Sequence, residues 1–334
     1  MTNNHNPHSR FLLSFFLTVC AILVTIGSFN LLIDPYNIFE TPTWHGINQK
    51  KKDTSGHFAR LFQAAEIIKL KPQAILFGSS RVIRGFDPHD LEQLIQIPSH
   101  NGGMSGTNFE EIYGYFEHAL YNQPKLKTVI IGLDFFAFDK RRKNSPDFSW
   151  NRLSISHTSH EEYFDALFGK LALKESLKVV YFNLTEKNNK WTIGFIPGDL
   201  PEFDEKYIAN VKKEYGKWQV SLYRVELFRK LVEKCRECQI DLKVFISPAQ
   251  TVYWDTIREI GMWPAFEQLK RDLSAIHPIW DFSGSNCITT KEAEKDGEPL
   301  YYECSHFRPY VGKLILNKMY GASDPYPTFG VLLE

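Results

Sequence analysis

The chain has 334 residues, of which 43% are hydrophobic and 14% aromatic, and its 39 Lys and Arg residues balance 39 Asp and Glu residues. This length and composition predict a globular protein with a substantial apolar core. A chain without net positive charge lacks the field that holds a polyanion, so we expect no nucleic-acid partner. The basic run Lys50 to Lys52 is expected to be a solvated stretch.

The N-terminal region contains one long uncharged segment. Residues 11–33 include no charged side chain, and as a helix these roughly 23 residues would extend about 34 Å, enough to cross a bilayer. A cleaved signal peptide would have a shorter apolar core followed by a small-residue cleavage site. We therefore expect a cytoplasmic head at 1–10, an uncleaved transmembrane anchor at 11–33 and a linker at 34–57. An anchor of this kind normally exports the chain on its C-terminal side, so the working topology places the rest on the extracytoplasmic, periplasmic side.

Four of the five cysteines lie outside this anchor. Cys235 and Cys238 have the spacing of a redox pair, but they follow a helical pattern instead of preceding a helix, so we favour two small residues at a helix end. In an exported protein Cys287 and Cys304 could form a disulfide, or Cys304 could point into the core as a small apolar residue. No set of residues has the spacing of a metal site, and no metal or cofactor is expected.

The first strong structural signal after the anchor is the apolar run Ala74 to Phe77, which is followed directly by Gly78, Ser79 and Ser80. This pattern is typical of a buried strand that ends in a tight turn. If a helix begins at the turn, Ser80 lies near a helix N-terminus, where backbone N–H groups favour developing negative charge. A serine in this position is more often a helix cap than a nucleophile, so other residues must decide between the two.

The remaining apolar patterns alternate between helical and extended periodicity, which predicts an open, largely parallel sheet covered by helices. The region around 140–218 is irregular and rich in aromatic residues. We interpret it as an insertion over one face of the sheet, which either holds a substrate or partner chain or only covers apolar surface. The expected elements, in chain order, are a helix at 58–70, the strand at 74–77, a helix from Asp87, a faint strand within 95–101, a helix at 109–120 opened by a capping box at Thr107 and Glu110, a strand at 128–133, a helix at 222–235, strands at 241–247 and 278–282 flanking a helix at 263–275, and a helix at 311–320.

Residues that could together catalyse acyl transfer lie in separate loops of this predicted fold. Such a site needs a nucleophile, a base that takes its proton, an acid that orients the base, and donors for the oxyanion. Ser80 can supply the hydroxyl, His306 the base and Glu303 the orienting acid. Glu303 and His306 are three residues apart and within reach of each other in a local helical turn. The amides of Ser80 and Gly106 are the candidate oxyanion donors, since both follow predicted strands at loop ends.

Three of these segments, within residues 72–320, resemble the sequence blocks of the SGNH, or GDSL-like, hydrolase superfamily. Gly78-Ser79-Ser80 is similar to the first block, with Ser80 at the nucleophile position. Asn101-Gly-Gly-Met-Ser-Gly106 is similar to the second block, which implies an oxyanion donor at Gly106. Glu303-Cys-Ser-His306 is similar to the last block, Asp-x-x-His, which implies His306 as base and Glu303 as its partner.

The chain departs from the superfamily pattern at three of the blocks. In the last block Glu303 replaces the usual Asp, which lengthens the orienting side chain by one methylene. Ser79 replaces the usual Asp of the first block, and this resembles the membrane-anchored branch that transfers D-alanine to teichoic acids or O-acetyl groups to exopolysaccharides. The third block, Gly-x-Asn-Asp, is absent after the strand at 128–133, so the asparagine donor is missing, and Asp134 cannot replace it because an ionised carboxylate only accepts hydrogen bonds. Arg81 or Arg84 could supply the lost donor or could be ordinary surface or ion-paired arginines. Together with Asn101 they are the candidate substrate-binding residues.

The resemblance implies a fold, an activity and a set of partners. The fold is an α/β, flavodoxin-like three-layer sandwich at 58–334, with a five-stranded parallel sheet of order 2-1-3-4-5 and the insertion at about 140–218. The implied activity is that of a membrane-anchored serine esterase or acyltransferase for short acyl groups, O-acetyl being favoured, on a cell-envelope or secreted glycan. Its expected partners are the glycan or acyl-ester substrate, the cytoplasmic membrane and a membrane acyltransferase. The alternative is a non-catalytic binding or assembly protein of a polysaccharide export or modification machinery that kept the fold and lost the chemistry.

Overall fold

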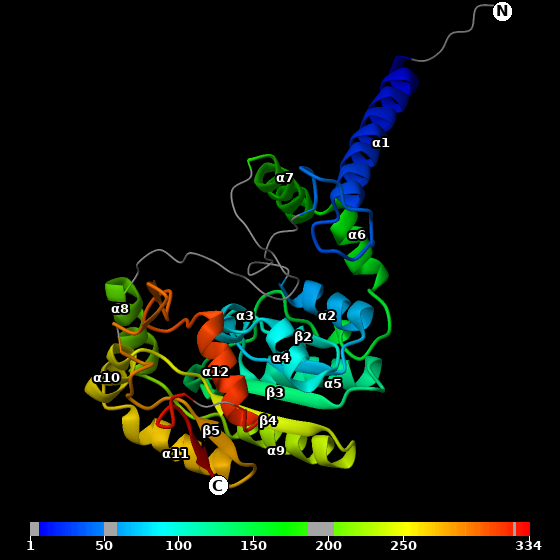
Figure 1. Cartoon of the computed structure of the whole chain (residues 1–334). Coiled ribbons are helices and arrows are strands. Elements are labelled where there is room, and N and C mark those ends of the chain that lie inside the picture. Colours follow the sequence, from blue (N-terminus) through cyan, green and yellow to red (C-terminus); the bar gives the residue numbers. More distant parts are fainter. Residues whose placement is uncertain (1–6, 50–58, 186–203, 291, 323–324) are drawn as a thin grey trace, which may run out of the picture. The chain divides into compact units, whose positions relative to one another are not determined.

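The computed structural model describes residues 7–49, 59–185, 204–290, 292–322 and 325–334 (Figure 1). These residues form two compact units. The first contains the described residues up to 49 together with 157–185, and the second contains the remaining described residues.

The first unit is built around helix α1 (Pro7–Ile33), which is long and apolar enough to cross a membrane. Two further helices, α6 (His160–Phe168) and α7 (Lys170–Leu184), pack against α1. The Asn30 side chain joins them, because its Nδ2 donates to Leu167 O at 2.7 Å and its Oδ1 accepts from Ser176 Oγ at 2.8 Å. Residues 157–185 belong to the region that we predicted as an insertion over the sheet, yet they form a unit with α1.

A six-stranded, mostly parallel sheet forms the centre of the second unit, with strand order β2-β1-β3-β4-β5-β8. The predicted order of the first five strands is confirmed, and the faint second strand lies within the predicted window. The sixth strand, antiparallel to β5, was not predicted. The strands are β1 (Ala74–Phe77), β2 (Ser99–Asn101), β3 (Thr128–Leu133), β4 (Asp241–Ile246), β5 (Ile279–Asp281) and β8 (Val331–Leu333).

Helices cover both faces of this sheet. Successive strand residues point to opposite sides, and in this sheet the residues on both sides are apolar. In β1, Ile75 and Phe77 enter one apolar cluster, whereas Ala74 and Leu76 enter the other. The first cluster includes residues of α2 (Ala59–Leu70), α5 (Phe109–Asn122), α9 (Leu222–Glu237), α10 (Thr251–Glu259) and α11 (Trp263–Ser274). The second includes residues of α3 (Ser80–Gly85), α4 (Pro88–Ile95) and α12 (Pro309–Met319). The result is an α/β arrangement with a fully buried β1.

The other described elements include two that add buried residues to the first cluster, helix α8 (Asp204–Tyr215) and the 3₁₀ helix η1 (Phe135–Phe138). The rest are the 3₁₀ helix η2 (Trp150–Arg152) and the two-stranded ribbon of β6 (Glu294–Lys295) and β7 (Glu298–Pro299).

Local capping explains where several helices begin. Asp87 caps α4 as predicted, its side chain accepting from His89 N. The predicted capping box at Thr107 and Glu110 is wrong by one residue, because Asn108 is the N-cap of α5 and accepts from Glu111 N. Thr107 is buried, and its hydroxyl donates to the Glu111 carboxylate instead.

Candidate active site

Ser80 is the first residue of α3 and lies immediately beyond the carboxyl end of β1. The turn between them needs a glycine, since a Cβ at Gly78 would lie 2.4 Å from Val82 Cγ2 and 2.8 Å from Gly132 O of β3. Ser79 is the N-cap of α3, and its hydroxyl accepts from Arg81 N at 3.2 Å. Of the two adjacent serines, one therefore caps the helix and the other presents its hydroxyl from the first turn.

The loop that carries His306 is fixed by the carboxylate of Glu303. Both oxygens of this carboxylate accept backbone N–H groups at 2.8 Å, one from Ser305 and one from His306. The same carboxylate also accepts from His306 Nδ1. The next residue, Phe307, packs so closely on Gly85 that a Cβ there would overlap its ring. The base loop is thereby anchored on the helix that begins with Ser80.

The structure brings Ser80, His306 and Glu303 together. His306 Nε2 lies 2.7 Å from Ser80 Oγ, within the distance expected of a nucleophile and its base. Because Nδ1 donates to Glu303, the neutral imidazole presents Nε2 as an acceptor for the Ser80 hydroxyl proton. The side chain of Glu303 is only 3% exposed and that of His306 13%, so the pair is screened from water on most sides.

The surroundings of Glu303 keep its carboxylate ionised. Burial alone would raise its pKa, but hydrogen bonds from His306 and Ser305 N, together with the charges of His306 and Arg81, lower the pKa to about 2. A carboxylate that stays charged can orient the imidazole and stabilise the imidazolium that forms when His306 takes a proton.

The glycine-rich turn after β2 is attached to the segment that carries Ser80. Met104 N donates to Gly78 O at 2.9 Å, and a Cβ at Gly103 would lie 2.9 Å from Ile83 N in α3. Gly106 has φ of +63°, a left-handed conformation that favours glycine. Within the described part of the chain, the amides of Ser80 and Gly106 donate to no acceptor, so both remain available to an oxyanion.

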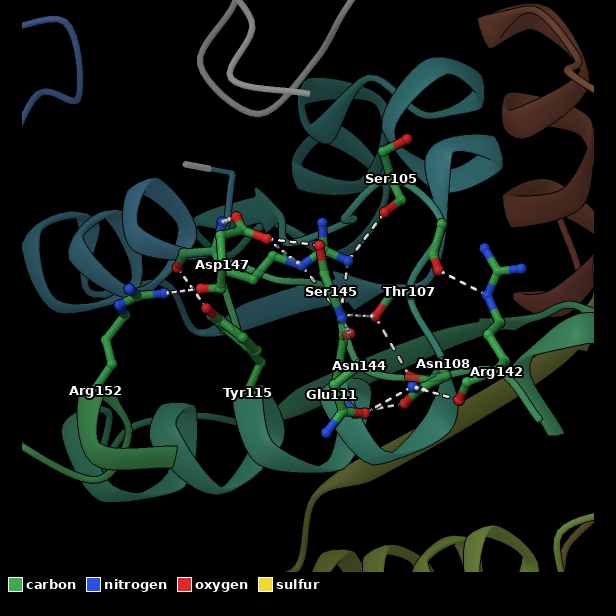
Figure 2. Close-up of polar contacts among 12 residues, drawn as sticks. Ser105, Thr107, Asn108, Glu111, Tyr115, Arg142, Asn144, Ser145, Asp147 and Arg152 are labelled. Atoms are coloured by element: carbon green, nitrogen blue, oxygen red, sulfur yellow. Dashed lines mark hydrogen bonds and ion pairs between the residues drawn. The ribbon is translucent and has the colours of Figure 1, made fainter. Parts of the chain in front are cut away.

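A buried polar network holds this turn from the side of α2 and α5, and Figure 2 shows its members around Ser105, Thr107 and Glu111. The Arg60 guanidinium donates to the Glu111 carboxylate and, through Nη2, to Ser105 O at 3.0 Å. Arg142 Nε donates to Gly106 O at 2.9 Å. The side chains of Arg60 and Glu111 are 2% and 1% exposed, so this ion pair is held without solvent.

The contact between Arg60 and Ser105 O fixes the direction of the Gly106 N–H. Ser105 O and the Gly106 N–H belong to one trans peptide unit, in which the C=O and N–H point in opposite directions. Because Arg60 binds the carbonyl, the N–H points away from Arg60. A cation on the carbonyl also polarises the peptide, which makes its N–H a stronger donor.

Arg81 forms a second buried ion pair near Ser80. Its Nη1 donates to Asp134 Oδ1 at 2.8 Å, and both side chains are almost fully buried. Its guanidinium also lies over the ring of Tyr253, 4.7 Å from the centroid. Burial would lower the pKa of Arg81, but Asp134 and the neighbouring Tyr253, Tyr207 and Tyr215 together raise the pKa well above its ordinary value.

Of the residues suggested for substrate binding, Arg81 and Asn101 require correction. Arg81 is occupied by Asp134, the ion-paired alternative that the sequence left open. Asn101 is fully buried, and its amide holds α3 by donating to Val82 O and Phe86 O at 2.9 Å each. Arg84 is half-buried at the other end of α3 from Ser80, and no described residue is its hydrogen-bond or ion-pair partner.

Several residues of the site were not identified from the sequence. Ser305 Oγ donates to Tyr207 OH at 2.8 Å and contacts the Glu303 carboxylate, which places an α8 residue beside the base. Tyr207 lies within the irregular aromatic region at about 140–218, where no periodicity distinguishes it. Arg60 and Glu111 were likewise missed, because no local motif marks two helical residues that pair in the interior.

The cysteines take no part in this arrangement. Cys287 is exposed and Cys304 is buried in the core, and the two are not bridged. Cys235 is buried in α9, where burial raises the pKa of its thiol to about 12, and Cys238 caps the end of that helix. The described residues contain no group of His, Cys, Asp or Glu side chains that could hold a metal ion.

The site is thus a hydrogen-bonded series of hydroxyl, imidazole and carboxylate beside a glycine turn with unused amides. No protein-family model matches the chain, and no curated protein sequence matches it.

Proposed function

We propose that the protein is a membrane-anchored, SGNH-type serine esterase or O-acyltransferase that acts on short acyl esters of an extracytoplasmic glycan. The observation that carries the proposal is the series Ser80 Oγ, His306 Nε2, His306 Nδ1 and Glu303, in which each group is hydrogen-bonded to the next. The strand order, the position of Ser80 after β1 and the resemblance of the three sequence segments also support it.

The geometry allows a two-step acyl transfer. Ser80 Oγ attacks the ester carbonyl carbon while His306 Nε2 takes its proton, and the resulting oxyanion accepts from the amides of Ser80 and Gly106. As the tetrahedral intermediate collapses, the imidazolium returns the proton to the departing alcohol and leaves an acyl group on Ser80. Water then releases the acid in an esterase, or a glycan hydroxyl accepts the acyl group in a transferase.

The location of this chemistry depends on the anchor. Helix α1 has the length and hydropathy of a single membrane span, and the proposed topology places the catalytic unit on the extracytoplasmic side, where cell-envelope and secreted glycans are found. The choice of a glycan ester rests on the resemblance to the membrane-anchored branch of the superfamily.

The test is ester turnover by the full chain in detergent, with p-nitrophenyl acetate as the probe. We expect Ser80→Ala and His306→Ala each to lower kcat by at least about 100-fold. Ser99→Ala is the matched control, since the hydroxyl of this β2 serine donates to Ile97 O and lies outside the site. A covalent fluorophosphonate adduct on Ser80, located by mass spectrometry, would identify the nucleophile independently.

Turnover by Ser80→Ala at the rate of the unsubstituted chain would refute the proposed chemistry. The same conclusion would hold if the folded chain neither hydrolysed acetyl esters nor reacted with the fluorophosphonate. The fold would then serve a non-catalytic binding or assembly role.

A further inference from the structure

The first unit exposes large apolar side chains near one end of α1. Outside α1, its described segments carry seven such side chains, whereas the described second unit, several times as long, carries eight. The seven are Trp44, Ile47, Phe164, Leu171, Leu177, Tyr181 and Leu184. Such a concentration of exposed apolar surface marks a site of interaction.

Hydrogen bonds place these segments at the C-terminal end of α1. Asn30 contacts Leu167 O of α6 and Ser176 of α7. On the side of the following loop, Asn48 Nδ2 donates to Leu32 O at 3.0 Å, and its Oδ1 accepts from Trp44 N. Helices α6 and α7 and the loop with Trp44 therefore surround the same end of the helix.

The depth of the C-terminal end of α1 in a bilayer follows if α1 is the proposed membrane anchor. The present inference rests on that part of the proposed function. The uncharged run begins at Phe11, and about 20 residues cross the hydrocarbon core, so the far boundary falls near Asn30. The Phe168 ring contacts Gly27, about one helical turn, or 5 Å, inside that boundary. The α6–α7 connection thus lies at the level of the lipid headgroups and the first methylenes.

The exposed face of α7 has the composition of an interfacial helix. Leu177, Tyr181 and Leu184 recur at helical spacing on the side opposite the buried Ser176 and Val179. Lys170 and Lys174 lie on the same outer side at a spacing of four residues. Lysine stems can cover apolar surface while their ammonium groups reach water or phosphate, and exposed Tyr and Trp are typical of the membrane interface.

We propose that α6, α7 and the Trp44 loop form a collar that lies in the headgroup region of the leaflet through which α1 leaves the membrane. The occupant of its apolar surface is lipid. The groove beside Phe168 would take an acyl chain, because it is apolar and lined by Cys20, Leu23, Val24, Gly27 and Leu31 of α1.

The experiment places a fluorescent nitrobenzoxadiazole probe on the full chain in nanodiscs of defined phosphatidylcholine. Cysteines are introduced singly as Leu177→Cys on α7, Leu17→Cys on α1 and Tyr121→Cys on α5, after Cys20→Ser, Cys238→Ser and Cys287→Ser remove the thiols that are not buried. The three sites are matched, since their side chains are 56%, 57% and 60% exposed. Quenchers are lipids with a doxyl group near the glycerol, lipids with a doxyl group deep in the chain, and aqueous iodide.

We expect the shallow lipid quencher to act at least about threefold more strongly at position 177 than at 121, and iodide to act correspondingly more weakly. Position 17 should respond to the deep quencher. If the probe at position 17 is quenched by the deep lipid quencher but the probe at position 177 is quenched like the one at 121, the collar is refuted and the anchor stands. If 17 does not respond, the anchor itself fails. If 177 is shielded from both lipid and aqueous quenchers, a second copy of the chain covers the surface, and the lipid assignment is overturned.

Discussion

Replacing Glu303 by Gln should remove a defined part of the acid sensitivity of the fold. In the folded chain the pKa of Glu303 is lowered from its ordinary value of 4.5 to about 2. The folded state therefore favours the carboxylate, and this stabilisation is fully present above pH 4.5 and is lost as the pH falls toward 2. At about 1.4 kcal/mol per pH unit, the complete loss is about 3 kcal/mol, of which about 2 kcal/mol is gone by pH 3.

The assay is denaturant unfolding of the full chain in detergent, followed by tryptophan fluorescence at pH 6 and pH 3. Other carboxylates also titrate in this range, so the informative quantity is the difference between chains. The free energy of unfolding should fall by about 2 kcal/mol less for Glu303→Gln than for the unsubstituted chain. Glu233→Gln, which removes an exposed carboxylate from α9, is the control. If the free energy of unfolding fell equally with pH in all three chains, the lowered pKa of Glu303 would not contribute to the stability of the fold, and this explanation would be refuted.

Three further predictions concern the residues that support the site. Gly106→Ala and Gly261→Ala both place a side chain at a positive φ and should each cost about 1–2 kcal/mol in thermal unfolding. Only Gly106→Ala should also lower kcat for the ester, by about tenfold or more. An equal loss of kcat in both variants would contradict the proposed role of the Gly106 amide as an oxyanion donor. Arg60→Met leaves a buried carboxylate unpaired and should destabilise the fold by about 3–5 kcal/mol in denaturant, whereas Arg60→Lys should lower kcat without raising KM. Arg81→Met should be similarly destabilising, and combining it with Asp134→Leu should recover most of the loss; a double-mutant cycle without coupling would contradict their pairing.

The sheet and the turn that carries Ser80 were predictable because their signals are local. The run from Ala74 to Phe77 is apolar at every position since β1 is buried on both faces. β3 is likewise buried at every position, and Thr128 is its one polar residue. The glycine after β1 and the proline after Asp87 mark backbone geometry that few residues allow. The three-residue β8 was missed because so short a strand has too few residues to show a period.

The supports of the site and the surroundings of the anchor could not be predicted in this way. Arg60 and Glu111 are 51 residues apart, and a helical arginine and glutamate ordinarily indicate a solvated face. Only the tertiary fold buries the pair. Similarly, Asn30 interrupts an apolar helix near its end, and its role depends on Ser176, 146 residues later in the chain. In both cases polar residues are satisfied by partners that no spacing rule connects.

In the proposed mechanism, the separation of Ser80 from His306 along the chain determines when Ser80 can become reactive during synthesis. The two residues are 226 positions apart, and at about 5–20 residues per second roughly 10–45 s pass between their synthesis. During that interval Ser80 has no base, and its hydroxyl is no more nucleophilic than any other serine. The amides of the glycine turn can form earlier, because β1, β2 and α5 are close in sequence. In the proposed mechanism, a nascent chain would therefore acquire the oxyanion donors before His306 is present to activate Ser80, and it would leave esters unmodified until its synthesis is complete.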